Sequence, residues 1–193
     1  MSTKNIMIVG VGGQGSVLAS KLLGRLLTGR GYDVKVSEVH GMSQRGGSVV
    51  TYVRYGASVA SPVIDRGQAD FIVSFELLEA ARWLEYLRPG GQVVTSTQRL
   101  APMPVLTGAA SYPEGLLEKM RAAGFSVDAL DCVALAERAG NVRSVNLVLL
   151  GRLSRYFPDI PEEAWREAIE VCVPEKFLEL NKEAFALGRS TGS

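Results

Sequence analysis

Short apolar runs alternate with segments of helical periodicity along the first two thirds of the chain. The apolar and β-branched runs predict strands at residues 6–9, 34–37, 48–54, 71–75, 92–95 and 126–130. Elsewhere, apolar residues recur at every third or fourth position, which predicts helices over 16–29, 76–87 and 113–123. Strands that alternate with helices are typical of an α/β sheet with right-handed crossover connections.

The pattern changes after Asp131, where strand-like runs stop and helical periodicity continues almost to the end of the chain. Prolines separate three predicted helices, over residues 142–156, 161–172 and 174–187. No linker or low-complexity segment divides the chain, so residues 1–193 are expected to form a single domain. The expected fold is a Rossmann-like, mostly parallel sheet flanked by helices, with a helical C-terminal third. Residues 59–64 are expected to pair with strand 48–54 as an antiparallel edge hairpin.

A glycine-rich turn joins the first predicted strand to the first predicted helix. Gly10, Gly12 and Gly15 have the spacing G-x-G-x-x-G, with Gly13 and Gln14 between them. In this motif the first glycine permits a tight turn, the second lets the backbone approach a phosphate, and the third allows close helix packing. The free N–H groups of the helix N-terminus favour an anion. The turn is consistent with nucleotide or phosphate binding, and also with a purely structural role.

A second glycine-rich loop follows the second predicted strand. Glu38 ends that strand, where a dinucleotide-binding protein carries an acid for the ribose hydroxyls. The polar residues Ser43, Gln44 and Arg45 come next, followed by Gly46. Arg45 is suited to bidentate pairing with a phosphate or carboxylate, and a glycine beside it would let the backbone come close. The alternative is that the arginine braces the loop or lies in an interface.

Composition and charge exclude several classes of function. The chain carries 21 basic and 20 acidic side chains, a net charge of +1, so bulk electrostatics favour neither nucleic acid nor an anionic membrane. No apolar stretch reaches the ~18 residues of a membrane span, and the first residues lack the pattern of a signal peptide. We therefore expect a cytoplasmic protein.

Few residues are suited to catalysis or metal binding. The two cysteines, Cys132 and Cys172, are far apart in sequence and are expected to be small core residues rather than ligands of an iron–sulfur cluster. The single histidine, His40, lacks a companion for zinc and an orienting acid for catalysis. Glu76 is expected to cap a helix, and Asn146 to bond backbone or hold a loop. Neither a catalytic residue nor a metal site is assigned.

Both glycine-rich loops, taken in order, carry a family resemblance. Residues 9–15 and 38–47, followed by Val53 and Arg54, closely resemble the gamma subunit or domain of 2-oxoacid:ferredoxin oxidoreductases, the pyruvate/ketoisovalerate oxidoreductase gamma family. The resemblance extends over nearly the whole chain and includes Asn146 and residues 181–188. The chain looks most like the small subunit of indolepyruvate oxidoreductase or the gamma subunit of the 2-oxoglutarate enzyme, and the sequence does not choose between them.

The resemblance implies a subunit of an enzyme that oxidatively decarboxylates a 2-oxo acid, forms an acyl-coenzyme A and reduces ferredoxin. Thiamine diphosphate and iron–sulfur clusters would be carried by partner subunits, and the isolated chain would be inactive. Coenzyme A is the ligand that the loops could hold, its diphosphate on the first loop and another phosphate on Arg45. The candidate cofactor-binding residues are Gly10, Gly12, Gly13, Gln14, Gly15, Ser43, Gln44, Arg45 and Gly46.

Two alternatives remain open at this point. The chain could be a purely structural subunit whose glycine loops pack against the thiamine-bearing partner without touching a ligand. It could also be an independent NAD-type dehydrogenase, with Glu38 on the ribose hydroxyls, although no acid or base for hydride transfer stands out. The identity of the 2-oxo acid, the electron acceptor and the subunit stoichiometry are not encoded in any residue that we can single out.

Overall fold

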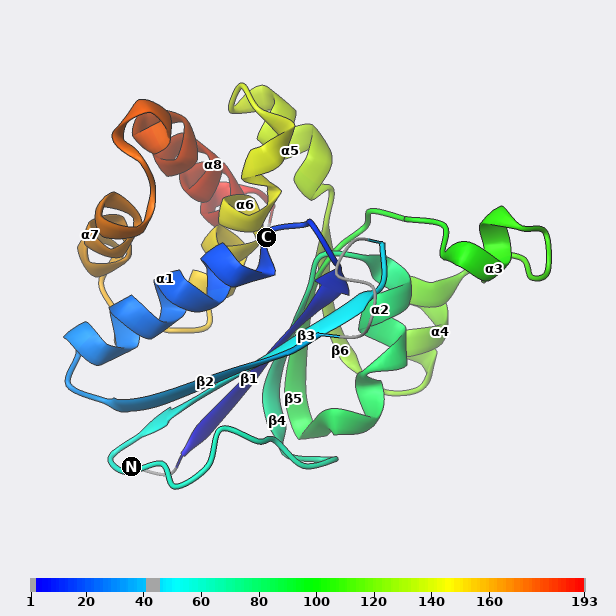
Figure 1. The fold of residues 1–193 in the computed structure, drawn as a ribbon, viewed down its shortest axis with the longest axis horizontal. Helices are drawn as coiled ribbons and strands as arrows, with labels where there is room; N and C mark the ends of the chain where they lie inside the picture. Colours follow the sequence, from blue (N-terminus) through cyan, green and yellow to red (C-terminus); the bar gives the residue numbers. More distant parts are fainter. Residues whose placement is uncertain (1–2, 41–45, 193) are drawn as a thin grey trace.

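A computed structural model describes residues 3–40 and 46–192 of the chain. One six-stranded sheet runs through the molecule, with helices on both of its faces (Figure 1). Its strands are β1 (Lys4–Val11), β2 (Asp33–His40), β3 (Ser48–Gly56), β4 (Ala69–Ser74), β5 (Leu87–Ser96) and β6 (Ser126–Leu130). Their order across the sheet is β2-β3-β1-β4-β5-β6.

Strand β3 runs in the opposite direction to the other five described strands. It pairs antiparallel with both β1 and β2, whereas β1, β4, β5 and β6 pair in parallel, so the predicted mostly parallel sheet is confirmed. The expected edge hairpin is wrong, because residues 59–64 form a loop and β3 lies inside the sheet. The apolar side chains of β3 explain its place: Val50 and Val53 are buried on opposite faces of the sheet.

The larger helical layer covers one face of the sheet. It contains α1 (Ser16–Gly29), α5 (Cys132–Arg138), α6 (Val145–Ser154), α7 (Glu162–Cys172) and α8 (Leu178–Ser190), with short 3-10 turns η2 (Val142–Ser144) and η3 (Glu175–Phe177). Helix α1 has the predicted boundaries, and the helical C-terminal third is confirmed. That third has four helices rather than three, because Asp131 accepts a hydrogen bond from the Ala134 N–H at 3.0 Å and so caps α5.

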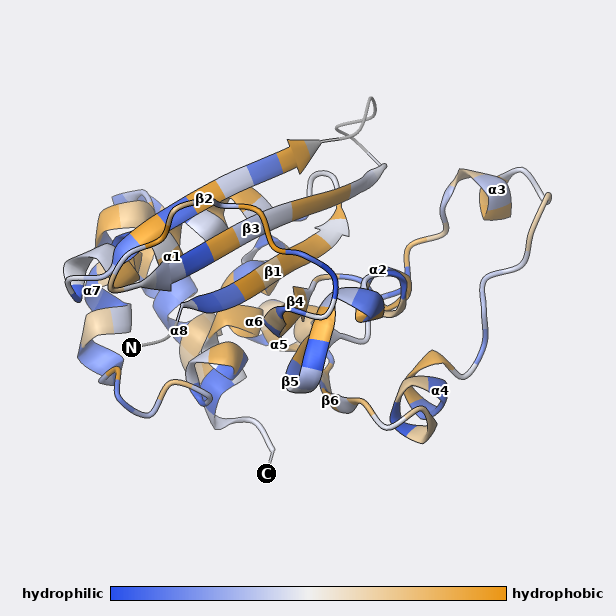
Figure 2. Cartoon of the chain, turned by 90° about the horizontal axis from the view of Figure 1, so that it is seen from below, coloured by the Kyte–Doolittle hydropathy of each residue, from blue (hydrophilic) through white to orange (hydrophobic). Residues whose placement is uncertain are grey.

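Smaller helices cover the other face. Helix α2 (Leu77–Arg82), the 3-10 turn η1 (Leu84–Tyr86) and α4 (Leu116–Ala122) pack there, while α3 (Met103–Leu106) stands away from the body on a long connection (Figures 1 and 2). The predicted helix 76–87 therefore ends earlier, since Leu87 already belongs to β5. Among the described helices, none combines the length and the apolar character needed to cross a membrane.

Helix α6 is the centre of the larger layer. Nearly all of its residues are buried, including Leu147 and Leu149, which are fully inaccessible to solvent. It crosses α8 at very short range, because Gly151 of α6 and Gly188 of α8 let the two backbones approach. A helix that is apolar on all sides must be covered all round, and here the sheet, α1, α5 and α8 surround it.

Candidate functional site

The two glycine loops meet at the carboxyl ends of β1 and β2. The Gly12 N–H donates to the Gly47 carbonyl at 2.8 Å, and the Gly46 N–H donates to the Gly12 carbonyl at 3.4 Å. The antiparallel return of β3 produces this contact, since it brings the end of the second loop alongside β1. The predicted residues Ser43, Gln44 and Arg45 lie outside the described part of the chain.

Gln14 fills the inside of the first loop. Its Oε1 accepts from the Val11 N–H at 2.7 Å, and its Nε2 donates to the Phe75 carbonyl at 3.2 Å and to Gln98 Oε1 at 2.9 Å. One side chain thus connects the segments that follow β1, β4 and β5. Because its amide groups already have partners within the protein, Gln14 braces the loop.

Each glycine of the first loop has a distinct environment. A Cβ on Gly10 would lie 2.8 Å from Gln14 Oε1, and one on Gly15 would lie 2.8 Å from Asn146 Nδ2. Gly13 and Gly15 have positive φ angles of 102° and 90°, but the space around Gly13 is open. The buried Asn146 lies beside the turn into α1, and its Oδ1 accepts from the Leu147 N–H at 3.0 Å, which is the bond to backbone that the sequence predicts.

A cavity of about 310 Å³ lies at the N-terminus of α1. Gly15 is the N-cap of α1 and provides no side-chain cap, and the first turn of the helix has no acidic residue, so its N–H groups present a positive potential. Arg143 lines the same cavity and has no ion-pair partner among residues 3–40 and 46–192. The complete lining is Gly13, Gln14, Gly15, Gln98, Val142, Arg143 and Val145. These groups together suit an anion.

A larger cavity of about 800 Å³ lies on the other side of the loops. Residues 11–12 and 46–48 line it from the body, α2 contributes Leu78, Glu79 and Arg82, and residues 100–104 and Leu106 close it from the far side. Most of these side chains are apolar. The polar lining residues are Ser48, Glu76, Glu79 and Arg82. Glu79 is buried, accepts a short hydrogen bond from the Ser48 hydroxyl, and lies 3.5 Å from Arg82 Nε.

Glu76 organises the base of this cavity. Its Oε2 accepts from the Glu79 N–H at 2.8 Å, which confirms the predicted helix cap. Its Oε1 accepts from the Leu100 N–H at 3.1 Å and from the Tyr112 hydroxyl at 2.5 Å. Burial and the neighbouring carboxylate raise the pKa of Tyr112, so the phenol stays protonated and keeps donating at neutral pH.

The position of Glu38 argues against dinucleotide binding. Glu38 accepts from the Ser20 hydroxyl of α1 at 3.2 Å. Strand β3 separates its strand from β1, and two strand spacings of about 4.8 Å place the end of β2 about 10 Å from the end of β1. In a Rossmann sheet the acid-bearing strand is the direct neighbour of β1, so this topology removes the acid from the first glycine loop.

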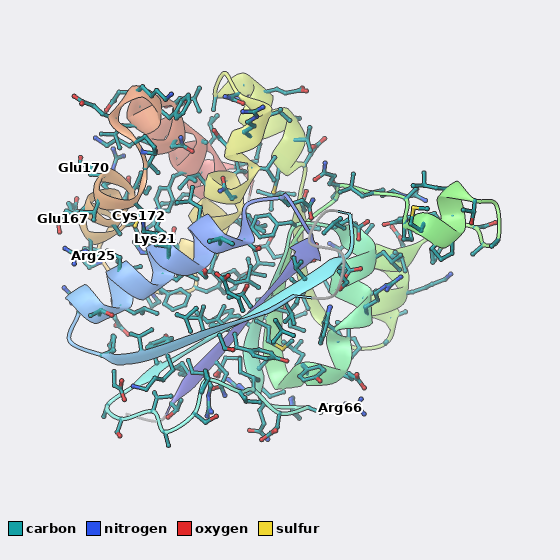
Figure 3. The ribbon with its side chains drawn as sticks, in the orientation of Figure 1. Lys21, Arg25, Arg66, Glu167, Glu170 and Cys172 are labelled. Atoms are coloured by element: carbon teal, nitrogen blue, oxygen red, sulfur yellow. The ribbon has the colours of Figure 1, made fainter. Side chains whose placement is uncertain are left out.

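Both cysteines are buried free thiols, as the sequence predicts. Burial raises the pKa of Cys132 to about 12 and also raises that of Cys172. Lys21 and Arg25 of α1 lie near Cys172 of α7 and lower its pKa, but the effect of burial is larger (Figure 3). Within the described ranges, no cluster of three or more His, Cys, Asp and Glu side chains is arranged to hold a metal ion.

The comparisons with known proteins agree with this architecture. Residues 5–191 match the family model described as pyruvate ferredoxin/flavodoxin oxidoreductase. The chain belongs to this family. It is 44% identical over 195 residues to indolepyruvate oxidoreductase subunit IorB of Thermococcus kodakarensis, covering 97% of this chain and 95% of that protein. The IorB subunit of Pyrococcus horikoshii is 43% identical with the same coverage.

Solved structures confirm the fold of this family member. A keto/oxoacid ferredoxin oxidoreductase gamma subunit from Geobacter sulfurreducens superposes with a TM-score of 0.71, at 23% identity and 96% coverage of both chains. The 2-oxoglutarate:ferredoxin oxidoreductase of Magnetococcus marinus gives 0.71 at 21% identity, covering 98% of this chain and 31% of that one. The resemblance drawn from the two glycine loops is therefore confirmed: the chain belongs to the 2-oxoacid ferredoxin oxidoreductase family, and its fold is that of a gamma subunit.

Two residues of the site escaped the sequence analysis. Gln98 and Arg143 line the cavity at α1, yet they are far from the first loop in sequence and carry no motif of their own.

Proposed function

We propose that this subunit works in a complex that oxidatively decarboxylates an aryl-substituted 2-oxo acid such as indolepyruvate, forms the acyl-coenzyme A and passes the electrons to ferredoxin. The observation that carries the substrate class is the 44% identity, over 97% of the chain, to a protein named indolepyruvate oxidoreductase subunit. Thiamine diphosphate and iron–sulfur clusters belong to the partner subunits in this proposal. Two buried thiols are too few for a four-cysteine cluster, which supports that division.

We further propose that the cavity at α1 receives phosphate groups of coenzyme A. The support is chemical: uncapped N–H groups, the open backbone at Gly13 and the Arg143 guanidinium, which has no ion pair within the described part of the chain, surround one space. Gly12 is unsuited to donate there, because its N–H already bonds to Gly47. Arg45 stays a candidate for a further phosphate. A purely structural role is the second candidate, favoured by the internal hydrogen bonds of Gly12, Gln14 and Gly46.

Assay of the purified complex tests the proposed reaction. We expect the chain to co-purify with a thiamine- and iron–sulfur-bearing partner, and the complex to reduce a viologen dye only when both a 2-oxo acid and coenzyme A are present. Indolepyruvate should be turned over with a higher kcat/KM than pyruvate or 2-oxoglutarate. Turnover by the isolated chain, or a preference for pyruvate, would contradict the proposal.

Substitution of Arg143 tests the proposed phosphate site. We expect Arg143→Ala to raise the KM for coenzyme A of the complex about tenfold or more, because a hydrogen bond to a charged group is worth about 1.5–3 kcal/mol. The kcat at saturating coenzyme A should change little. Arg66→Ala is the matched control, since Arg66 is exposed in the loop that leaves the opposite end of the sheet (Figure 3). An unchanged KM for coenzyme A, or a loss of assembly in its place, would favour the structural role.

A further inference from the structure

The connection between β5 and α4 projects from the body as an arm. We call residues 101–113, which include α3, the α3 arm; it extends away from the sheet in both ribbon views (Figures 1 and 2). Every residue of the arm is exposed or only partly buried. None of them is charged, although 21% of the whole chain is. A solvent-facing segment without charges is unusual for a surface loop, which is normally polar.

The arm presents large apolar side chains to solvent. Met103 is 64% exposed and Leu106 is 67% exposed, the two highest values among the large hydrophobic residues in the described ranges. Figure 2 shows apolar residues on α3, far from the apolar core between the sheet and its helices. Exposed apolar surface of this kind marks interaction sites when it is contiguous with other apolar surface.

The base of the arm is fixed on both sides. Glu76 accepts from Leu100 before the arm and from Tyr112 near its end, at 3.1 and 2.5 Å. The Arg99 guanidinium lies 4.4 Å from the centre of the Tyr112 ring and pairs with Glu114 at 2.7 Å. The arm is therefore held in place before any partner arrives, which lowers the entropic cost of binding.

The tip of the arm is ordered by its own hydrogen bonds. The Thr107 N–H and hydroxyl both donate to the Met103 carbonyl, at 2.9 and 3.0 Å, and the Ala110 N–H donates to the Pro104 carbonyl at 3.0 Å. Together with the fixed base, these bonds give the exposed Met103 and Leu106 side chains a defined position relative to the body.

The arm also forms one wall of the larger cavity. Leu100, Met103 and Leu106 face the cavity of about 800 Å³ from the arm side, and Val11 and Gly12 face it from the body. This volume is sufficient for several apolar side chains. Charged residues such as Arg82, Arg99 and Glu114 lie around the cavity and the base of the arm. An apolar centre with a charged rim is the composition of a protein–protein interface.

We propose that the α3 arm and the larger cavity form the docking surface for the thiamine-bearing partner subunit, which inserts an uncharged, apolar segment between the arm and the body. This inference rests on the proposed function, which supplies the partner. The arm carries no charge, and the carboxylates Glu76 and Glu79 at the base of the cavity already have partners within the protein. A charged partner segment would therefore lose its hydration without gaining a free opposite charge, so the complementary surface is uncharged. The inserted segment would lie against Gly12 and so beside the glycine loops.

The double variant Met103→Ser/Leu106→Ser tests this surface. We expect the Kd for the purified partner subunit to rise at least tenfold, while the isolated chain keeps its circular dichroism spectrum and melting temperature because both side chains are exposed. The matched control is Val171→Ser/Phe177→Ser, whose parent side chains are 60% and 41% exposed on α7 and η3, at the far side of the molecule from α3 (Figure 1). It should bind the partner as the wild type does.

Three outcomes would overturn the docking proposal. The first is a double variant that binds the partner as tightly as the wild type does. The second is a change confined to the KM for coenzyme A, which would make the cavity a small-molecule site. The third is a variant that changes only the self-association of the chain, which would make the arm a contact between copies. Failure of the wild-type chain to bind any thiamine-bearing partner is a different result, because it would refute the proposed function itself.

Discussion

Replacement of Gly188 by alanine is expected to lower the melting temperature of the chain by about 6–12 °C. A Cβ on Gly188 would collide with the backbone of Val148, and a Cβ on Gly151 would collide with the backbone of Phe185. Backbone atoms cannot rotate away, so α6 and α8 would have to separate. Overpacking a core costs about 1–3 kcal/mol, and a collision with backbone atoms belongs at the upper end, about 3 kcal/mol. Each kcal/mol shifts the melting temperature of a chain of this size by about 2–4 °C.

Gly29→Ala is the matched control for this substitution. Gly29 also lies in a helix, but its added Cβ would meet no atom within 4 Å. Alanine favours a helix over glycine by up to about 1 kcal/mol, so this variant should melt at or slightly above the temperature of the wild type. Calorimetry of the three chains provides the measurement. If Gly188→Ala melted together with Gly29→Ala, the close crossing of α6 and α8 would be contradicted.

Local patterns predicted most of the fold. Helix α1 begins and ends at the predicted residues, and β6 covers the predicted 126–130. Both segments are bounded by clear signals, a glycine turn before α1 and a periodic helix before β6. The place of β3 was predicted wrongly because strand pairing is non-local: the sequence of residues 48–54 indicates a strand, but its neighbours depend on which partner buries both of its apolar faces.

Site residues were predictable from the sequence only where they belong to one contiguous motif. The first glycine loop is a contiguous motif, and its place between β1 and α1 followed directly from the sequence. Gln98 and Arg143 reach the same cavity from distant segments, so their contribution depends on tertiary structure. The α3 arm escaped for another reason: its prolines, glycine and small residues show no periodicity, and such a sequence is indistinguishable from an ordinary loop.

The second large effect is expected at the entry to α1. Gly15→Ala should lower the free energy of unfolding by about 3 kcal/mol, because a non-glycine residue at positive φ costs about 1–3 kcal/mol and the new Cβ also meets the Asn146 side chain. Gly13→Ala separates the two causes. Gly13 has a similar positive φ of 102°, but the space around it is open, so its substitution should cost only about 1 kcal/mol.

A double-mutant cycle between Gly15 and Asn146 identifies the collision directly. Asn146→Ala alone should be destabilising, since the buried Asn146 Oδ1 accepts from the Leu147 N–H at 3.0 Å. In the Gly15→Ala chain the same substitution removes the group that the new Cβ meets, so the double variant should be more stable than the sum of the single effects predicts. Urea unfolding of the four chains measures this coupling. Strictly additive effects would show that a Cβ at position 15 does not meet the Asn146 side chain and that the cost of Gly15→Ala comes from its positive φ alone.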